Sequence, residues 1–155
     1  MSGWQSETGN WQLAIGNQTD WLGLPSVVTP WYCERIRDLD NSQVLGRAKD
    51  FVKSAYLLAG RLPERERFGL RSQIERASVS IAANIGEGLG RGTQGDLERF
   101  LRIASGSAAE ARVLIELAAD LHPLDEIETH KIRSDLEALR KMLTRFVGVV
   151  HRSRR

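Results

Sequence analysis

Long apolar runs, cysteine and histidine are scarce in this 155-residue chain, and each scarcity excludes a class of protein. No apolar segment approaches the roughly 18 residues that a membrane-spanning helix needs, and the chain does not open with a basic stretch followed by an apolar one. The single cysteine, Cys33, cannot form a disulfide within the chain and lacks the partners of a metal site. We therefore expect a cytoplasmic protein with no membrane partner.

The scarcity of histidine argues against a metal-dependent enzyme. Helix bundles hold pairs of metal ions through Glu-x-x-His motifs, but none of the three histidines, His122, His130 and His151, follows a glutamate at that spacing. No serine has the context of a nucleophile elbow, and Cys33 has no evident base. We expect no catalytic residue, no metal and no cofactor.

One glycine pattern resembles a nucleotide-binding motif. Residues 90–95 match G-x-G-x-x-G formally. That fingerprint binds dinucleotides only where a strand precedes it, and here a helical pattern precedes it. The glycine-rich stretch from Gly86 to Gly92 is therefore predicted to be a turn between helices.

Positive charge is concentrated toward the end of the chain, although the net charge is only +2. Residues 1–42 contain five acids and two bases. The last sixteen residues contain no acid and these six bases: Arg140, Lys141, Arg145, Arg152, Arg154 and Arg155. Such a segment can bind phosphate groups. A solvated helix face with a frayed tail explains it equally well.

The first 42 residues differ in composition from the rest of the chain. They hold all four tryptophans, Trp4, Trp11, Trp21 and Trp31, among Gly, Asn, Thr and Pro. No helical or strand period persists there, so we predict an irregular Trp-rich N-terminal extension over residues 1–42. Three interpretations stay open: an arm docked on the rest of the protein, a partner-binding segment, or upstream sequence included with the gene.

From Ser42 onward the apolar residues recur every three to four positions, which indicates amphipathic helices. Four such segments follow one another, and their breaks are Pro63, the glycine-rich stretch and Pro123. Thr93, three residues before Asp96, is a plausible N-cap for the third helix. The sequence therefore predicts an all-α protein with an antiparallel up-down four-helix bundle over residues 43–150 and a basic C-terminal tail over 151–155.

A row of polar residues accompanies the apolar stripe of the second helix, and its first four members each stand one position before a residue of that stripe. The row consists of Gln73, Arg76, Ser80, Asn84, Glu87 and Arg91. On the third helix, Glu110 shares a face with apolar residues, and Arg76 is its natural ionic partner. We favour a structural or subunit-interface network over a ligand site.

The stretch from Phe68 to Gly88, followed by Arg91, resembles the bacterial four-helix bundle protein family whose early members are encoded in intervening sequences of large-subunit ribosomal RNA genes. The later segment from Arg99 to Ser107, with Glu110, is similar as well. The resemblance spans roughly residues 43–147 and implies a helical bundle that assembles into homopentamers. A more distant resemblance is to the accessory variability determinant of diversity-generating retroelements, a basic pentamer that binds nucleic acid and partners a reverse transcriptase.

Together these patterns favour a non-enzymatic, homopentameric bundle that binds RNA or DNA. The expected phosphate ligands are the six bases of the last sixteen residues, and an accessory role to a reverse transcriptase is one option. The alternative is a protein-interaction scaffold that binds no nucleic acid and docks through the Trp-rich arm. The two differ in salt dependence, because binding to phosphates weakens steeply as salt rises.

Overall fold

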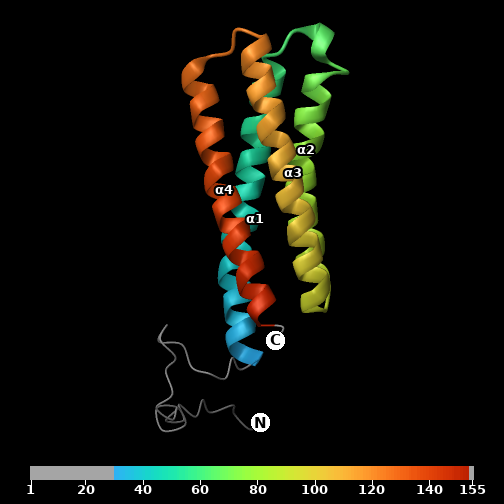
Figure 1. The fold of residues 1–155 in the computed structure, drawn as a ribbon, viewed down its shortest axis with the longest axis vertical. Coiled ribbons are helices and arrows are strands. Elements are labelled where there is room, and N and C mark those ends of the chain that lie inside the picture. The colour runs from blue at the N-terminus through green and yellow to red at the C-terminus, as the bar shows by residue number, and fades with distance from the viewer. Residues whose placement is uncertain (1–29, 154–155) are drawn as a thin grey trace, which may run out of the picture.

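The computed structural model describes the backbone of residues 30–153 and the side chains of residues 43–153. The elements are α1 (Pro30–Gly60), the 3-10 turn η2 (Glu64–Glu66), α2 (Leu70–Gly90), α3 (Gln94–Leu121) and α4 (Glu126–Arg152). Successive helices run in opposite directions along one long axis (Figure 1), and the described residues contain no strand. The predicted all-α antiparallel four-helix bundle is confirmed.

The core consists of the apolar stripes of the four helices. Each helix packs against two others, because α2 contacts α1 and α3, while α4 contacts α3 and α1. Branched side chains such as Ile81 and Leu143 fill the interior together with a row of alanines on α3. Those alanines are Ala104, Ala108, Ala111 and Ala118. One continuous core, built from stripes visible in the sequence, therefore holds the bundle together.

Helix α1 begins earlier than the sequence analysis predicted. Its first residue is Pro30, so residues 30–42 are helical and the predicted irregular extension is wrong over that range. Proline suits the first turn of a helix, and no further proline or glycine occurs before Gly46 to end it. The rest of the predicted extension, residues 1–29, lies outside the described residues, as do the last two of the chain.

Side chains cap the starts of α3 and α4. The predicted cap at Thr93 is confirmed, because its Oγ1 accepts a hydrogen bond of 3.1 Å from the backbone N–H of Asp96. At the start of α4, Asp125 Oδ1 accepts one of 2.8 Å from the backbone N–H of Glu128. Each cap satisfies a donor that the first helical turn leaves unpaired and fixes where the helix begins.

A second polar contact closes the end of the bundle opposite the α2–α3 turn. Glu66 Oε2 accepts a hydrogen bond of 3.2 Å from the backbone N–H of Leu70, and Glu66 Oε1 lies 3.1 Å from Nε2 of the buried His122. The Leu70 hydrogen bond is the main cause that lowers the pKa of Glu66. One carboxylate thus joins the start of α2 to the end of α3.

Most of the stretch from Gly86 to Gly92 is helical rather than a turn, because α2 continues to Gly90. Gly88 explains why glycine is needed there. A Cβ atom at this position would lie 2.9 Å from Cβ of Phe100 and 3.2 Å from Cδ1 of Leu97. The missing side chain therefore lets α2 approach α3 closely, whereas a Cβ at Gly86 would meet nothing within 4 Å.

We expect Gly88→Ala and Gly86→Ala to change stability in opposite directions. Alanine is the better helix former by about 1 kcal/mol, so Gly86→Ala should raise the free energy of unfolding by about 0.5–1 kcal/mol. At Gly88 overpacking against Phe100 should outweigh that gain and lower it by about 1–2 kcal/mol. Urea unfolding of both variants measures the difference. Equal stabilisation by the two substitutions would show that α3 can shift away from Gly88 without lowering the free energy of unfolding.

Candidate nucleic-acid interface

The charged residues of the bundle are sorted along its long axis. Contacts between helices set their register and divide the bundle into two halves. The half with the α2–α3 turn and the end of α4 consists of residues 43–50, 77–109 and 139–153. This half, called the basic half below, holds nine bases and four acids. The remainder, residues 51–76 and 110–138, is the acidic half, with nine bases and eleven acids. Among the side chains that the structure describes, the two halves of the bundle therefore carry opposite net charge.

Helix α4 contributes the predicted bases to the basic half. Lys141, Arg145 and Arg152 are exposed and form no ion pair with another described residue. Arg140 is half-buried, and its Nη1 lies 2.9 Å from Oε2 of Glu137, which neutralises much of its charge. The remaining two predicted bases, Arg154 and Arg155, lie outside the described residues. Three of the six predicted residues thus present unneutralised charge on one helix.

A shallow depression marks the surface of α4 in this region. Its lining consists of Glu137, Arg140, Lys141, Thr144 and Arg145. The depression is open to solvent and built from one helix, so it suits a contact with an extended backbone rather than the enclosure of a small ligand.

The α2–α3 turn and the start of α3 add further bases to the basic half. The guanidinium of the exposed Arg99 lies 4.8 Å from the ring centroid of Phe100, and that of Arg91 lies 5.6 Å from it. Arg91 also pairs with Glu87 one turn earlier on α2. Stacking on the Phe100 ring holds the guanidinium of Arg99 in a defined plane, from which its N–H groups can reach an anion.

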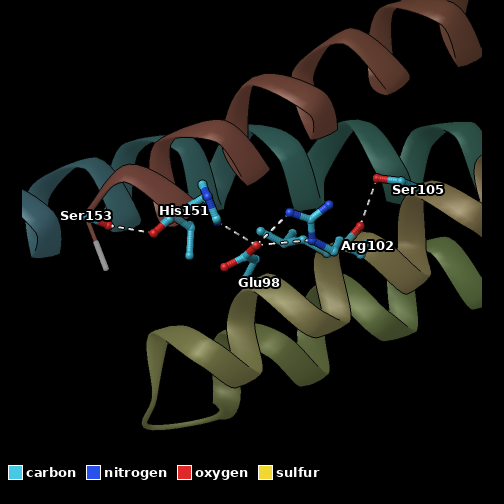
Figure 2. Close-up of polar contacts among 7 residues, drawn as sticks. Glu98, Arg102, Ser105, His151 and Ser153 are labelled. Atoms are coloured by element: carbon cyan, nitrogen blue, oxygen red, sulfur yellow. Dashed lines mark hydrogen bonds and ion pairs between the residues drawn. The ribbon is translucent and has the colours of Figure 1, made fainter. Parts of the chain in front are cut away.

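Between α3 and α4, a buried carboxylate joins two further cationic groups. Glu98 Oε1 accepts hydrogen bonds of 3.1 and 2.7 Å from Nε and Nη2 of Arg102, and it lies 3.1 Å from Nδ1 of His151 (Figure 2). The hydrogen bonds from Arg102 are the main cause that lowers the pKa of Glu98. The carboxyl group therefore stays ionised at neutral pH and acts only as an acceptor.

The sequence analysis missed Arg99 and Arg102 as parts of this surface. Neither residue belongs to a basic run along the chain, and both are separated from the α4 bases by about forty positions. Antiparallel packing places the start of α3 beside the end of α4. The predicted antiparallel order of the helices could have indicated them, because it places charged residues at the start of α3 near those at the end of α4.

The polar row of α2 divides into two kinds of contact. Ser80 and Asn84 lie between α2 and α3: the hydroxyl oxygens of Ser80 and Ser107 are 2.8 Å apart, and Asn84 Nδ2 donates hydrogen bonds of 2.7 and 3.1 Å to the backbone and side-chain oxygens of Ser80. The Ser80–Ser107 contact joins α2 and α3 within one chain, and Asn84 contacts Ser80 on α2 itself.

The outer members of the row lie nearer the surface. Arg76 donates a hydrogen bond of 2.5 Å to Gln73, and its Nη2 lies 3.5 Å from Oε1 of Glu110. Glu110 is exposed, so the pair spans the outer face of α2 and α3 rather than the core. On the same face of α3 the apolar side chains of Ile103 and Leu117 are exposed as well. The predicted role of the row in a subunit interface stays a prediction.

The described residues also lack two features typical of other classes of protein. Among the side chains that the structure describes, no group of three or more His, Cys, Asp or Glu residues could hold a metal ion. None of the described helices is long and apolar enough to cross a membrane.

Comparisons with known proteins agree with this fold. The family model described as "23S rRNA-intervening sequence protein" matches residues 40–145. Among solved structures, the chain is similar to a protein of unknown function from the S23 ribosomal protein family of Bacteroides thetaiotaomicron, with 24% sequence identity and a TM-score of 0.65. That alignment covers 70% of this chain and 98% of the other, and at this identity it shows the fold alone. No curated protein matches the chain.

Proposed function

We propose that this chain, which belongs to the 23S rRNA-intervening sequence protein family, is a non-enzymatic homo-oligomer and is expected to be a pentamer. In this proposal the protein binds RNA or DNA phosphates through the basic half of its bundle. Within this proposal, an accessory role to a nucleic-acid enzyme such as a reverse transcriptase is one way in which the protein would be used.

The sorting of charge carries the proposal. Among the side chains that the structure describes, nine bases against four acids in the basic half produce a positive field there, although the whole chain is nearly neutral. Three of these bases on α4, together with Arg99 on α3, form no ion pair with a described residue. Guanidinium and ammonium groups left unneutralised on a surface attract polyanions and bind phosphate oxygens. An oligomer would bring several basic halves together and strengthen the field.

The test removes three positive charges from either half of the bundle. We expect Lys141→Gln/Arg145→Gln/Arg152→Gln to weaken the binding of duplex DNA and of single-stranded RNA at low salt by roughly 10- to 100-fold. The slope of log K against log salt for duplex DNA should become shallower by about 2–3 units, since each phosphate contact contributes about 0.9. Fluorescence anisotropy at several salt concentrations measures both quantities.

The matched control is Arg65→Gln/Lys131→Gln/Arg133→Gln, which removes the same charge from exposed side chains of the acidic half. It should change affinity by no more than about threefold, because its sites lie farther from the bound phosphates than a Debye length at physiological salt. If both triple variants weaken binding equally, the protein responds only to net charge. Absence of binding by the wild-type protein at low salt would overturn the proposal.

The alternative function, a protein-interaction scaffold that docks through the Trp-rich arm, depends on residues 1–29, which lie outside the described residues. Binding through buried tryptophans should respond little to salt, so the same salt series separates the two functions.

A further inference from the structure

In the cluster of Glu98, Arg102 and His151, a buried carboxylate holds two exposed side chains in defined positions. The carboxylate side chain of Glu98 is 8% exposed, whereas the side chains of Arg102 and His151 are 60% and 47% exposed. One buried acceptor thus holds two exposed groups from different helices, α3 and α4, at a single oxygen atom (Figure 2). The cluster lies in the basic half, where the proposed function places the nucleic acid.

The ionised carboxylate decides which nitrogen of His151 carries the proton. A carboxylate that is not protonated can only accept, so Nδ1 of His151 must donate across the 3.1 Å contact with Glu98 Oε1. In the neutral ring the other nitrogen, Nε2, is then a hydrogen-bond acceptor. Nε2 forms no hydrogen bond with a described residue, and the ring is half exposed. His151 therefore offers a lone pair to a donor from outside the chain.

Arg102 offers the complementary chemistry. Its Nε and Nη2 contact Glu98, which leaves its Nη1 group for another acceptor. Because Glu98 already restrains the guanidinium of Arg102, this side chain loses less conformational entropy on binding a further anion than an unrestrained arginine would. Because Nδ1 of His151 and Nη2 of Arg102 both lie within 3.1 Å of the same Glu98 oxygen, the two groups are close neighbours.

We infer that Arg102 and His151 form a ribose–phosphate subsite that favours RNA over DNA, with Glu98 as the positioning residue for both. Arg102 binds a phosphate oxygen, and Nε2 of His151 accepts a hydrogen bond from the adjacent ribose 2′-hydroxyl. The 2′-hydroxyl is the donor that RNA has and DNA lacks. This inference rests on the proposed function and names the type of nucleic acid that the basic half recognises.

A purely structural role for the cluster makes a different prediction. If Glu98 only ties the start of α3 to the end of α4, then replacing His151 should lower stability and leave the relative affinities of RNA and DNA unchanged. The ratio of the two affinities is therefore the informative quantity, and the absolute affinity is not.

The experiment compares three short single-stranded probes of the same length: oligouridylate, oligodeoxyuridylate and 2′-fluoro-oligouridylate. The 2′-fluoro sugar keeps the RNA-like ring conformation but has no 2′ donor. At mildly alkaline pH, the wild-type protein should bind oligouridylate about three- to tenfold more tightly than either other probe. His151→Phe should reduce this preference to less than about twofold, whereas the control His130→Phe, on α4 in the acidic half, should leave it unchanged.

Arg102→Gln serves as a second variant with a different expected signature. It should weaken all three probes by a similar factor, because each probe carries the same phosphates. Thermal unfolding of every variant identifies any loss of fold. The wild-type affinities for the three probes test the subsite even if a variant unfolds, because that comparison needs no substitution.

Each outcome has a distinct meaning. If no probe binds at low salt, the proposed function fails and the subsite fails with it. If all three probes bind the wild-type protein equally, the nucleic-acid function stands and only the subsite is wrong. If RNA is preferred but His151→Phe keeps the preference, His151 is a structural tie and the inference is overturned.

Discussion

The double substitution Ile103→Glu/Leu117→Glu should convert the protein from an oligomer into a monomer. Both side chains are exposed on the outer face of α3, on either side of Glu110, and Leu121 continues the apolar series toward the end of the helix. Exposed apolar side chains gathered on one face of a bundle whose core is already complete mark a surface that another protein surface would cover. Two glutamates placed there would have to be buried without partners in an interface, which is costly.

Light scattering coupled to gel filtration measures the mass of the wild-type protein and of the variant. We expect a pentamer for the wild type and a single chain for the variant, with unchanged helical circular dichroism because glutamate is a good helix former. The matched control is Leu57→Glu/Ile127→Glu, which places two glutamates at exposed apolar positions on α1 and α4. This control should keep the wild-type mass.

Two results would contradict this prediction. A wild-type mass equal to one chain removes the oligomer from the proposed function altogether. A wild-type oligomer that survives the double substitution would place the interface on another face. In that case the Arg76–Glu110 pair would be an ordinary surface ion pair of little energetic consequence.

The second large effect concerns the core. Phe146 on α4 is 2% exposed, whereas Phe68, just before α2, is 88% exposed. Phe146→Ala should lower the free energy of unfolding by about 3–5 kcal/mol, because it removes buried apolar surface and leaves a cavity. Phe68→Ala should change it by less than about 1 kcal/mol, since it loses only an exposed contact with Arg67.

Urea unfolding at one fixed protein concentration measures both variants, because the stability of an oligomer depends on its concentration. A typical domain has only about 5–15 kcal/mol of stability, so complete unfolding of Phe146→Ala in buffer would also agree with the prediction. A loss below about 1 kcal/mol at Phe146 would mean that the end of α4 contributes little to the cooperative core. The basic residues that follow on α4 would then sit on a segment able to open independently.

The fold was predictable because its signals are local. Apolar residues at three- and four-residue spacing specify each helix, and Thr93 and Pro123 mark the breaks before α3 and α4. The start of α1 was not predicted, since Trp31 and the charged residues that follow it have no clear period, although no proline or glycine among them stops a helix. Gly88 was assigned to a turn for a similar reason. Glycine usually marks a break in sequence, and only the contact with Phe100 shows that it serves close packing.

The candidate site was predictable only where it lies on one helix. Lys141, Arg145 and Arg152 are close in sequence and share one helix, so their concentration was visible at once. Arg140 was expected to act with them, but its pairing with Glu137 reduces its availability. The cluster around Glu98 joins residues 53 positions apart. No local pattern indicates such a pairing, because it depends on the register between α3 and α4.

The sequence by itself thus determined the helices, their antiparallel order and the family, since each follows from periodicity and motifs within short segments. The tertiary structure alone decided that bases from α1, α3 and α4, together with Arg91 just after α2, gather in one half of the bundle. It also decided that Glu98 holds Arg102 and His151 at a single oxygen atom. The physical reason is that periodicity specifies which face of a helix is buried, whereas charge segregation and interhelical hydrogen bonds depend on how far each helix slides along its neighbour.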